Sequence, residues 1–264
     1  MKRLFRFVAA CCLAISMLTL LAGCGAGTDK PKPQKVIKIG VDAEFPPFSY
    51  KNSEGKLVGL DIELAQEAAK RSNTKVEFVP MAWYAKEDLL NKGEIDCIWS
   101  CYSIDGREDR YSWTKPYMQS GQYAVVRADS DILRLRDLQG KTVAAQATTK
   151  FLEEINKGTI KPGKVLVFSS AKECFDAVIS GKADATGGHL AVMMTEVKSD
   201  VAKSNLEVLL YQPLTRNKIG VAFKKGNTEQ AEELNQVLHA MYKDGTMERI
   251  AAKYYLSKDV LMYE

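Results

Sequence analysis

The stretch Asp96-Cys97-Ile98-Trp99-Ser100-Cys101-Tyr102-Ser103-Ile104-Asp105-Gly106-Arg107 decides the fold. Its first residues form a short apolar run that predicts a buried strand, and a polar turn with a glycine before an arginine is expected from Ser100 onward. In an open α/β sheet, ligands bind beyond the carboxyl ends of the strands. We therefore expect Ser103 and Arg107 to face a binding crevice.

The chemistry of these two side chains suits an anionic ligand. Arg107 carries a planar fork of donors that matches a carboxylate, and Ser103 offers a hydroxyl and a backbone N–H. The alternative is a surface arginine that pairs with Asp105 or Glu108. This stretch alone leaves both interpretations open.

The amino terminus has the pattern of an export signal. Three basic residues within 2–6 precede an apolar core, Phe7 to Leu21, that is shorter than a comfortable membrane span. Leu21-Ala22-Gly23-Cys24 follows and resembles the bacterial lipobox, in which the signal is cut before a cysteine that becomes lipidated. We expect residues 1–23 to be a signal peptide and Cys24 to anchor the protein to the membrane outside the cytoplasm. An ordinary cleaved signal with an incidental cysteine is the alternative.

Charge and cysteine content argue against several classes of protein. The formal charge of +4 falls to +1 without residues 1–23, which hold three positive charges and no negative one. Basic and acidic residues are interspersed, which argues against a nucleic-acid partner. Beyond Cys24 there remain Cys97, Cys101 and Cys174, an odd number without CxxC spacing, which argues against a disulfide framework and a zinc site. A bridge between Cys97 and Cys101 would strain a strand end, and no cofactor is indicated.

Strands and helices alternate along the rest of the chain. Strands are predicted over 36–41, 76–81, 122–127, 142–146, 165–168, 183–186 and 218–223. Helices are predicted over 61–71, from Trp83 to near Gly93, and over 151–156, 171–179, 229–242 and 246–255. Such alternation predicts an α/β fold with mostly parallel sheets.

The alternating pattern occurs twice, which predicts two lobes around a cleft. Asn91-Lys92-Gly93-Glu94-Ile95-Asp96 and Ile179-Ser180-Gly181-Lys182-Ala183-Asp184 both have the form of a helix end, a glycine and a strand start with aspartate. Strands near 122–127 and 217–223 would cross between the lobes and act as a hinge. The expected parts are a flexible tether, 24–35, one lobe, 36–122 plus 217–264, and a second lobe, 123–216.

Several motifs, in a fixed order, resemble those of one known family. They are Leu57-Val58-Gly59-Leu60-Asp61-Ile62-Glu63-Leu64-Ala65, Gly93-Glu94-Ile95-Asp96, Arg107 before Trp113-Thr114-Lys115-Pro116-Tyr117, Leu138-Gln139-Gly140-Lys141-Thr142-Val143, and Asp244-Gly245-Thr246. The family is the family-3 extracellular solute-binding proteins, the polar amino-acid receptors of ABC transporters. The resemblance implies a bilobed periplasmic-binding-protein-like fold, the type II Venus flytrap. It also implies that the protein captures a polar or charged amino acid and delivers it to a permease.

The resemblance implies roles for residues at the ligand's backbone. Arg107 matches the arginine that clamps the α-carboxylate, although the spacing from Ser103 is one residue shorter than the common pattern. Ser103 matches the hydroxyl residue that serves both the carboxylate and the α-ammonium, and Cys101 matches the position whose carbonyl meets the ammonium. Thr148 or Thr149 matches a threonine at a helix N-terminus on the opposite lobe. Plain N-capping is the alternative for both threonines.

Phe45 and Trp83 match the residues that sandwich the ligand's side chain. One position departs from the family. Where its members usually have an aspartate that neutralises the α-ammonium, this chain has His189, whose neutral imidazole lacks a negative charge. We hypothesise that Asp42 or Glu44 takes the positive charge of the ligand. Solvated loop carboxylates are the alternative.

Two further functions are compatible with this fold. An enzyme similar to the cyclohexadienyl dehydratases would need a general acid, for which Glu44 and His189 are the candidates. The other is a soluble ligand-sensing partner of a membrane receptor. We favour a non-catalytic, monomeric binding protein, because no pairing of a nucleophile with a base is evident.

Overall fold

The computed structural model describes residues 34–198 and 205–263. The predicted signal peptide, Cys24 and most of the predicted tether lie outside the described residues. From Lys35 onward the chain forms one compact unit. Within the part that the structure describes, no helix has both the length and the apolar character needed to cross a membrane.

A mixed sheet of ten strands runs through this unit. Its strands are β1 (Val36–Val41), β5 (Lys75–Pro80), β6 (Cys97–Ser103), β7 (Tyr111–Trp113), β8 (Met118–Arg127), β9 (Thr142–Gln146), β10 (Lys164–Phe168), β11 (Ala185–His189), β12 (Leu206–Val208) and β13 (Thr215–Lys224). The order is β10-β9-β11-β8-β13-β6-β1-β5, with β12 beside β8 and β7 beside β13. A small separate sheet contains β2 (Glu44–Phe45), β3 (Ser49–Lys51) and β4 (Leu57–Val58).

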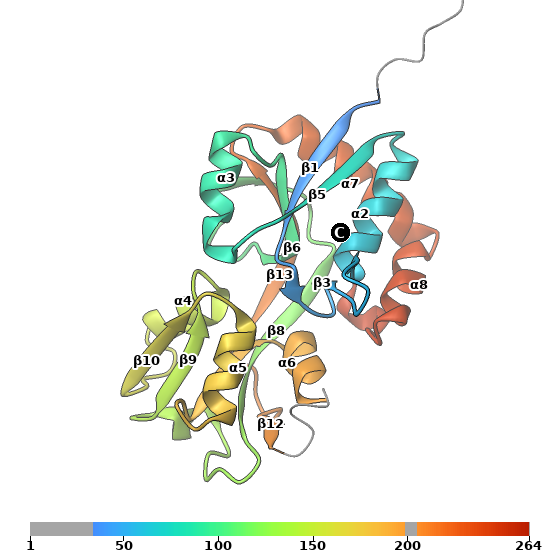
Figure 1. Cartoon of the computed structure of the whole chain (residues 1–264). Coiled ribbons are helices and arrows are strands. Elements are labelled where there is room, and N and C mark those ends of the chain that lie inside the picture. The colour runs from blue at the N-terminus through green and yellow to red at the C-terminus, as the bar shows by residue number, and fades with distance from the viewer. Residues whose placement is uncertain (1–33, 199–204, 264) are drawn as a thin grey trace, which may run out of the picture. The chain divides into compact units, whose positions relative to one another are not determined.

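Two groups of parallel strands are joined by two long antiparallel strands. The first strand group is β5, β1 and β6, and the second is β10, β9 and β11. Strands β8 and β13 pair antiparallel with each other. Strand β8 also pairs antiparallel with β11 of the second group, and β13 with β6 of the first; Figure 1 shows both strands running from one group to the other. The expectation of mostly parallel sheets therefore holds only within each group, because the two crossing strands merge both groups into one mixed sheet.

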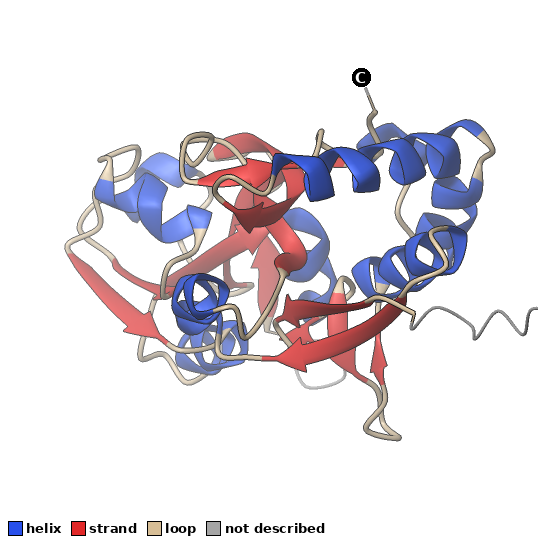
Figure 2. Cartoon of the chain, turned by 90° about the horizontal axis from the view of Figure 1, so that it is seen from above, coloured by secondary structure: helices blue, strands red, loops and turns tan. Residues whose placement is uncertain are grey.

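Helices cover both sides of the strands (Figure 2). They are α2 (Leu60–Arg71), α3 (Lys86–Lys92), α4 (Lys150–Asn156), α5 (Ala171–Ile179), α6 (Leu190–Val197), α7 (Thr228–Lys243) and α8 (Thr246–Lys253), with short 3₁₀ turns η1 (Trp83–Ala85), η2 (Leu135–Leu138) and η3 (Lys258–Val260). The predicted helices 61–71, 171–179, 229–242 and 246–255 agree with α2, α5, α7 and α8 to within two residues at each end. Helix α6 was not predicted, because its sequence is apolar at most positions and has no amphipathic period.

Two strand ends were predicted wrongly. Strand β6 continues past Ser100 to Ser103, although its pairing with β13 is irregular between Gly220 and Ala222, and Cys101 has a positive φ of 45°. The expected break is therefore a bulge inside the strand. Strand β11 includes Gly187-Gly188-His189, which was expected to follow it, because these residues pair antiparallel with β8.

The three cysteines of the described residues, Cys97, Cys101 and Cys174, are buried and free. Burial raises the pKa of each thiol, that of Cys174 to about 12. Cys97 and Cys101 are separate thiols of β6, so no disulfide joins them in the structure.

A buried carboxylate holds the bulge of β6 in place. Asp61, in the first turn of α2, is 1% exposed. It accepts a hydrogen bond from the backbone N–H of Cys101 at 2.7 Å and another from the hydroxyl of Tyr117 at 2.7 Å. Burial raises the pKa of Asp61 to about 7. Helix α2 is thus tied to β6 and to the segment that leads into β8.

Replacement of Asp61 by alanine should destabilise the protein. The backbone N–H of Cys101 and the hydroxyl of Tyr117 would lose their acceptor inside the core. We expect a loss of about 1–3 kcal/mol in the free energy of unfolding for each donor left unpaired. Urea unfolding at pH 7 measures this, with Tyr117→Phe, which removes one of the two bonds, as the milder comparison. An Asp61→Ala variant as stable as the wild type would contradict the anchoring role.

Candidate functional site

A cavity lies at the carboxyl ends of both strand groups, where ligands bind in open α/β sheets. Its lining residues come from the segments after β1, β6, β9 and β11 and from the elements packed beside them. They are Asp42, Phe45, Trp83, Ser100, Cys101, Tyr102, Ser103, Arg107, Gln122, Gln146, Thr148, Thr149, Lys150, Ala171, Cys174, Phe175, Thr186, Gly187, Gly188, His189 and Met193. This set includes every predicted ligand-binding residue except Glu44, which is exposed.

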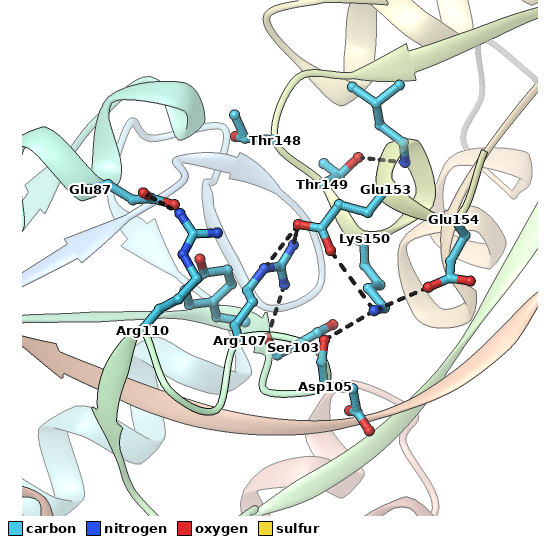
Figure 3. A network of polar contacts seen from close by, with 12 residues as sticks. Glu87, Ser103, Asp105, Arg107, Arg110, Thr148, Thr149, Lys150, Glu153 and Glu154 are labelled. Carbon is cyan, nitrogen blue, oxygen red and sulfur yellow. Dashed lines mark hydrogen bonds and ion pairs between the residues drawn. The ribbon is translucent and has the colours of Figure 1, made fainter. Parts of the chain in front are cut away.

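Arg107 is a buried cation in this cavity. The turn after β6 delivers it, and only 2% of the residue is exposed. Its Nη1 donates to the carbonyl oxygen of Ser103 at 2.9 Å, and its guanidinium lies 4.8 Å from the centre of the Tyr102 ring. Its Nε and Nη2 both donate to Oε1 of Glu153, at 3.1 and 2.5 Å (Figure 3). Arg107 is therefore not a surface arginine paired with Asp105 or Glu108.

Ser103 presents an unused hydroxyl to the same cavity. The residue is 1% exposed, and its Oγ has no hydrogen-bond partner among the described residues. Its carbonyl oxygen accepts from Arg107, so the hydroxyl and the guanidinium belong to one corner of the cavity. A buried hydroxyl without a partner is costly. A polar group placed in the cavity would relieve this cost.

The two threonines act differently. Thr149 is the N-cap of α4, because its Oγ1 accepts from the backbone N–H of Leu152 at 3.4 Å, and it also donates to the carbonyl oxygen of Gln146 at 2.7 Å. Thr148 has a positive φ of 60°, and its Oγ1 accepts from Nζ of Lys86 at 2.8 Å. Both side chains line the cavity, so the N-capping expected as an alternative is present at Thr149.

Of the two candidate carboxylates, Asp42 alone reaches the cavity. It is buried directly after β1, and its oxygens accept from Nε2 of Gln146 at 3.1 Å and from the backbone N–H of Glu44 at 2.9 Å. Burial raises the pKa of Asp42, while these two hydrogen bonds oppose the shift. Glu44 points to solvent, because its place in β2 is exposed.

His189 ends β11 as a buried, neutral imidazole. Burial and, to a smaller extent, the nearby charge of Arg107 lower its pKa to about 3. Nε2 of Gln122 lies 3.1 Å from one ring nitrogen and 3.2 Å from the other, and the Phe45 ring meets the imidazole edge to face at 6.2 Å between centres. His189 therefore supplies no charge at neutral pH.

Sequence reasoning missed the polar lining residues Gln122, Gln146 and Lys150, and also Lys86, which lies behind the lining residues Trp83 and Thr148. This lysine is 1% exposed and donates to the carbonyl oxygen of Trp83 at 3.1 Å and to Thr148. Its Nζ lies 4.5 Å from the centre of the Trp83 ring. Burial, with a contribution from Arg107, lowers its pKa to about 7. A lysine in the first turn of a short helix looks like a surface residue in the sequence, so no signal marked it.

The buried Lys86 should make stability depend on pH. Its pKa of about 7 in the folded protein lies below the value of about 10.4 in an unfolded chain. Between these values the unfolded chain binds more protons, so stability increases as the pH rises. We expect the wild type to gain about 2 kcal/mol relative to Lys86→Met between pH 7 and 9. Chemical unfolding of both proteins across this range measures the difference, and parallel pH profiles would contradict it.

Comparison with known proteins agrees with this geometry. The sequence model of the bacterial extracellular solute-binding proteins, family 3, matches residues 37–257. The probable amino-acid-binding protein YxeM of Bacillus subtilis is 28% identical over 247 residues, which cover 91% of this chain and 92% of that protein.

Two solved structures extend the likeness to the fold. An ancestral arginine-binding protein bound to arginine has 34% sequence identity and a TM-score of 0.79, over 84% of this chain and 99% of that one. An ancestral amino-acid-binding protein described as a precursor of cyclohexadienyl dehydratase has 32% identity and a TM-score of 0.75, over 83% of this chain and 95% of that one. The predicted bilobed α/β fold is thereby confirmed. The lobe boundaries at residues 122–123 and 216–217 stay a prediction.

Proposed function

Because this chain belongs to the bacterial extracellular solute-binding proteins, family 3, we propose that it captures one polar or charged amino acid and passes it to the permease of an ABC importer. The observation that carries this proposal is the pairing of a buried guanidinium with an unused hydroxyl in the cavity, Arg107 and Ser103. The α-carboxylate of an amino acid satisfies both, because it accepts charge-assisted hydrogen bonds from either donor.

The positive charge of the ligand is assigned to Asp42. Among the described residues that line the cavity, Asp42 is the one acidic side chain, and His189 is neutral. The amides of Gln122 and Gln146 add polar groups that take no charge. A ligand cation near Asp42 would lower the cost of burying this carboxylate. Trp83 and Phe45 provide aromatic wall for the ligand's side chain.

The two residues considered as general acids favour a binding protein over an enzyme. A dehydratase on this fold would need a general acid within reach of its substrate. Glu44 is exposed and does not line the cavity, and His189, with a pKa of about 3, is not in the imidazolium form that a general acid needs at neutral pH. Neither residue suits the role proposed for it.

We also propose that the protein lies outside the cytoplasm, because the members of its family are described as extracellular. Membrane attachment through Cys24 rests on the lipobox-like Leu21-Ala22-Gly23-Cys24 after a basic and apolar start. A monomer is part of the proposal.

A ligand screen tests the proposed function. Protein from Gly25 onward, unfolded and refolded to remove bound ligand, is heated with arginine, lysine, glutamine, histidine, cystine or prephenate. A ligand present at a thousand times its dissociation constant should stabilise the protein by about 4 kcal/mol. We expect this with a polar amino acid and not with the Arg107→Ala variant. Conversion of prephenate to phenylpyruvate, with no shift for any amino acid, would favour the enzyme instead.

Substitution of the two neighbouring carboxylates tests the place of the ligand's positive charge. Asp42→Asn should weaken binding of the amino acid found in the screen by about 10- to 100-fold, as loss of a hydrogen bond between charged groups predicts. Glu44→Gln should leave the affinity within about twofold of the wild type, because Glu44 does not line the cavity. Calorimetric titration at neutral pH measures both. Equal affinity in the Asp42→Asn variant would rule out this assignment.

A further inference from the structure

The guanidinium that the proposed function assigns to the ligand already holds a carboxylate of the protein. Glu153, from α4 beside the second strand group, reaches across to Arg107, which follows β6 of the first (Figure 3). Both Nε and Nη2 of Arg107 donate to the same oxygen of Glu153. This is the edge of a guanidinium that a carboxylate normally prefers.

Few donors of Arg107 remain for a ligand. A guanidinium has five N–H groups, and the structure commits two of them to Glu153 and one to the carbonyl oxygen of Ser103. A second carboxylate would have to use the remaining N–H groups close to the charge of Glu153. Two carboxylates that share one site repel each other, so simultaneous binding is unfavourable.

Glu153 is free to leave Arg107 without becoming an isolated charge. Its side chain is 32% exposed, whereas that of Arg107 is 2% exposed. Its other oxygen, Oε2, already lies 3.8 Å from Nζ of Lys150, in the first turn of the same helix. Water and Lys150 can therefore hold the displaced carboxylate.

We propose that Glu153 is an internal competitor of the ligand, whose carboxylate displaces it from Arg107 on binding. The inference rests on the proposed function and identifies a residue that determines affinity without itself touching the bound ligand. The measured dissociation constant is then the intrinsic one divided by the fraction of molecules in which Arg107 is free. A ligand without a carboxylate cannot replace Glu153, which makes the contact a filter for the chemistry of the ligand.

The competition predicts which rate constant changes. When Glu153 blocks Arg107 in part of the population, association slows in proportion, while the bound complex, in which Glu153 has already left, dissociates as before. A residue that contacts the ligand would instead change dissociation. The two roles are therefore separable by kinetics.

The test compares Glu153→Gln with Glu154→Gln in the wild-type chain, with the amino acids of the screen as probes. Glutamine keeps the shape of either side chain and removes its charge. Glu154 is the matched control, because it lies on the same helix and pairs with Lys150 at 3.1 Å and Lys157 at 3.0 Å but not with Arg107. Any gain that comes only from the loss of one negative charge on α4 would appear in both variants.

Stopped-flow fluorescence should show that Glu153→Gln associates about two- to fivefold faster with an unchanged dissociation rate, the range expected for removal of one partly exposed ion pair. Glu154→Gln should show no gain. Three results would each overturn the competition: an equal gain in both variants, an unchanged association rate in Glu153→Gln, or a faster dissociation rate in Glu153→Gln. If no amino acid binds any of the three proteins, the proposed function fails. If amino acids bind all three equally, the competition alone is wrong.

Discussion

The buried guanidinium of Arg107 is the charge on which the site depends. A cation that is 2% exposed costs several kcal/mol unless an anion and hydrogen-bond acceptors surround it. The chain supplies the Tyr102 ring, the carbonyl oxygen of Ser103 and the carboxylate of Glu153. Because Glu153 comes from the second strand group, the neutralisation of one charge also links the two sides of the cavity.

The frame around Arg107 is held by a second buried ionisable group, the carboxyl group of Asp61. It accepts from the backbone of β6 at Cys101, where φ is positive, and so fixes the irregular part of the strand just before Ser103 and Arg107. The hydroxyls of Ser49 and Ser100, 2.7 Å apart, tie the small sheet to the same part of β6. Geometry in the cavity therefore rests on polar contacts in the core as well as on apolar packing.

Sequence reasoning succeeded where the signal is local. Helices α2 and α5 were predicted well, and in the structure α2 buries one apolar face while a capping box between Ser170 and Glu173 begins α5. The candidates Ser103 and Arg107 followed from a strand end and a motif. Glu153 and Lys86 were missed because their partners lie 46 and 62 residues away along the chain, and nothing in a single sequence pairs them. Asp42 and Glu44 could not be separated either, since only the turn after β1 decides which of them is buried.

The proposed roles of Arg107 and Asp42 together describe one kind of ligand. A ligand carboxylate on Arg107 leaves Glu153 with Lys150, which also pairs with Glu154, while Asp42 remains without a cation and His189 stays neutral. A cationic group on the same ligand then matches Asp42. One carboxylate and one cationic group, the zwitterion of an amino acid, thus give both Arg107 and Asp42 a partner of opposite charge. A second carboxylate would compete for Lys150, which already pairs with Glu153 and Glu154, or meet Lys86, whose pKa of about 7 makes it a weak counter-charge at neutral pH.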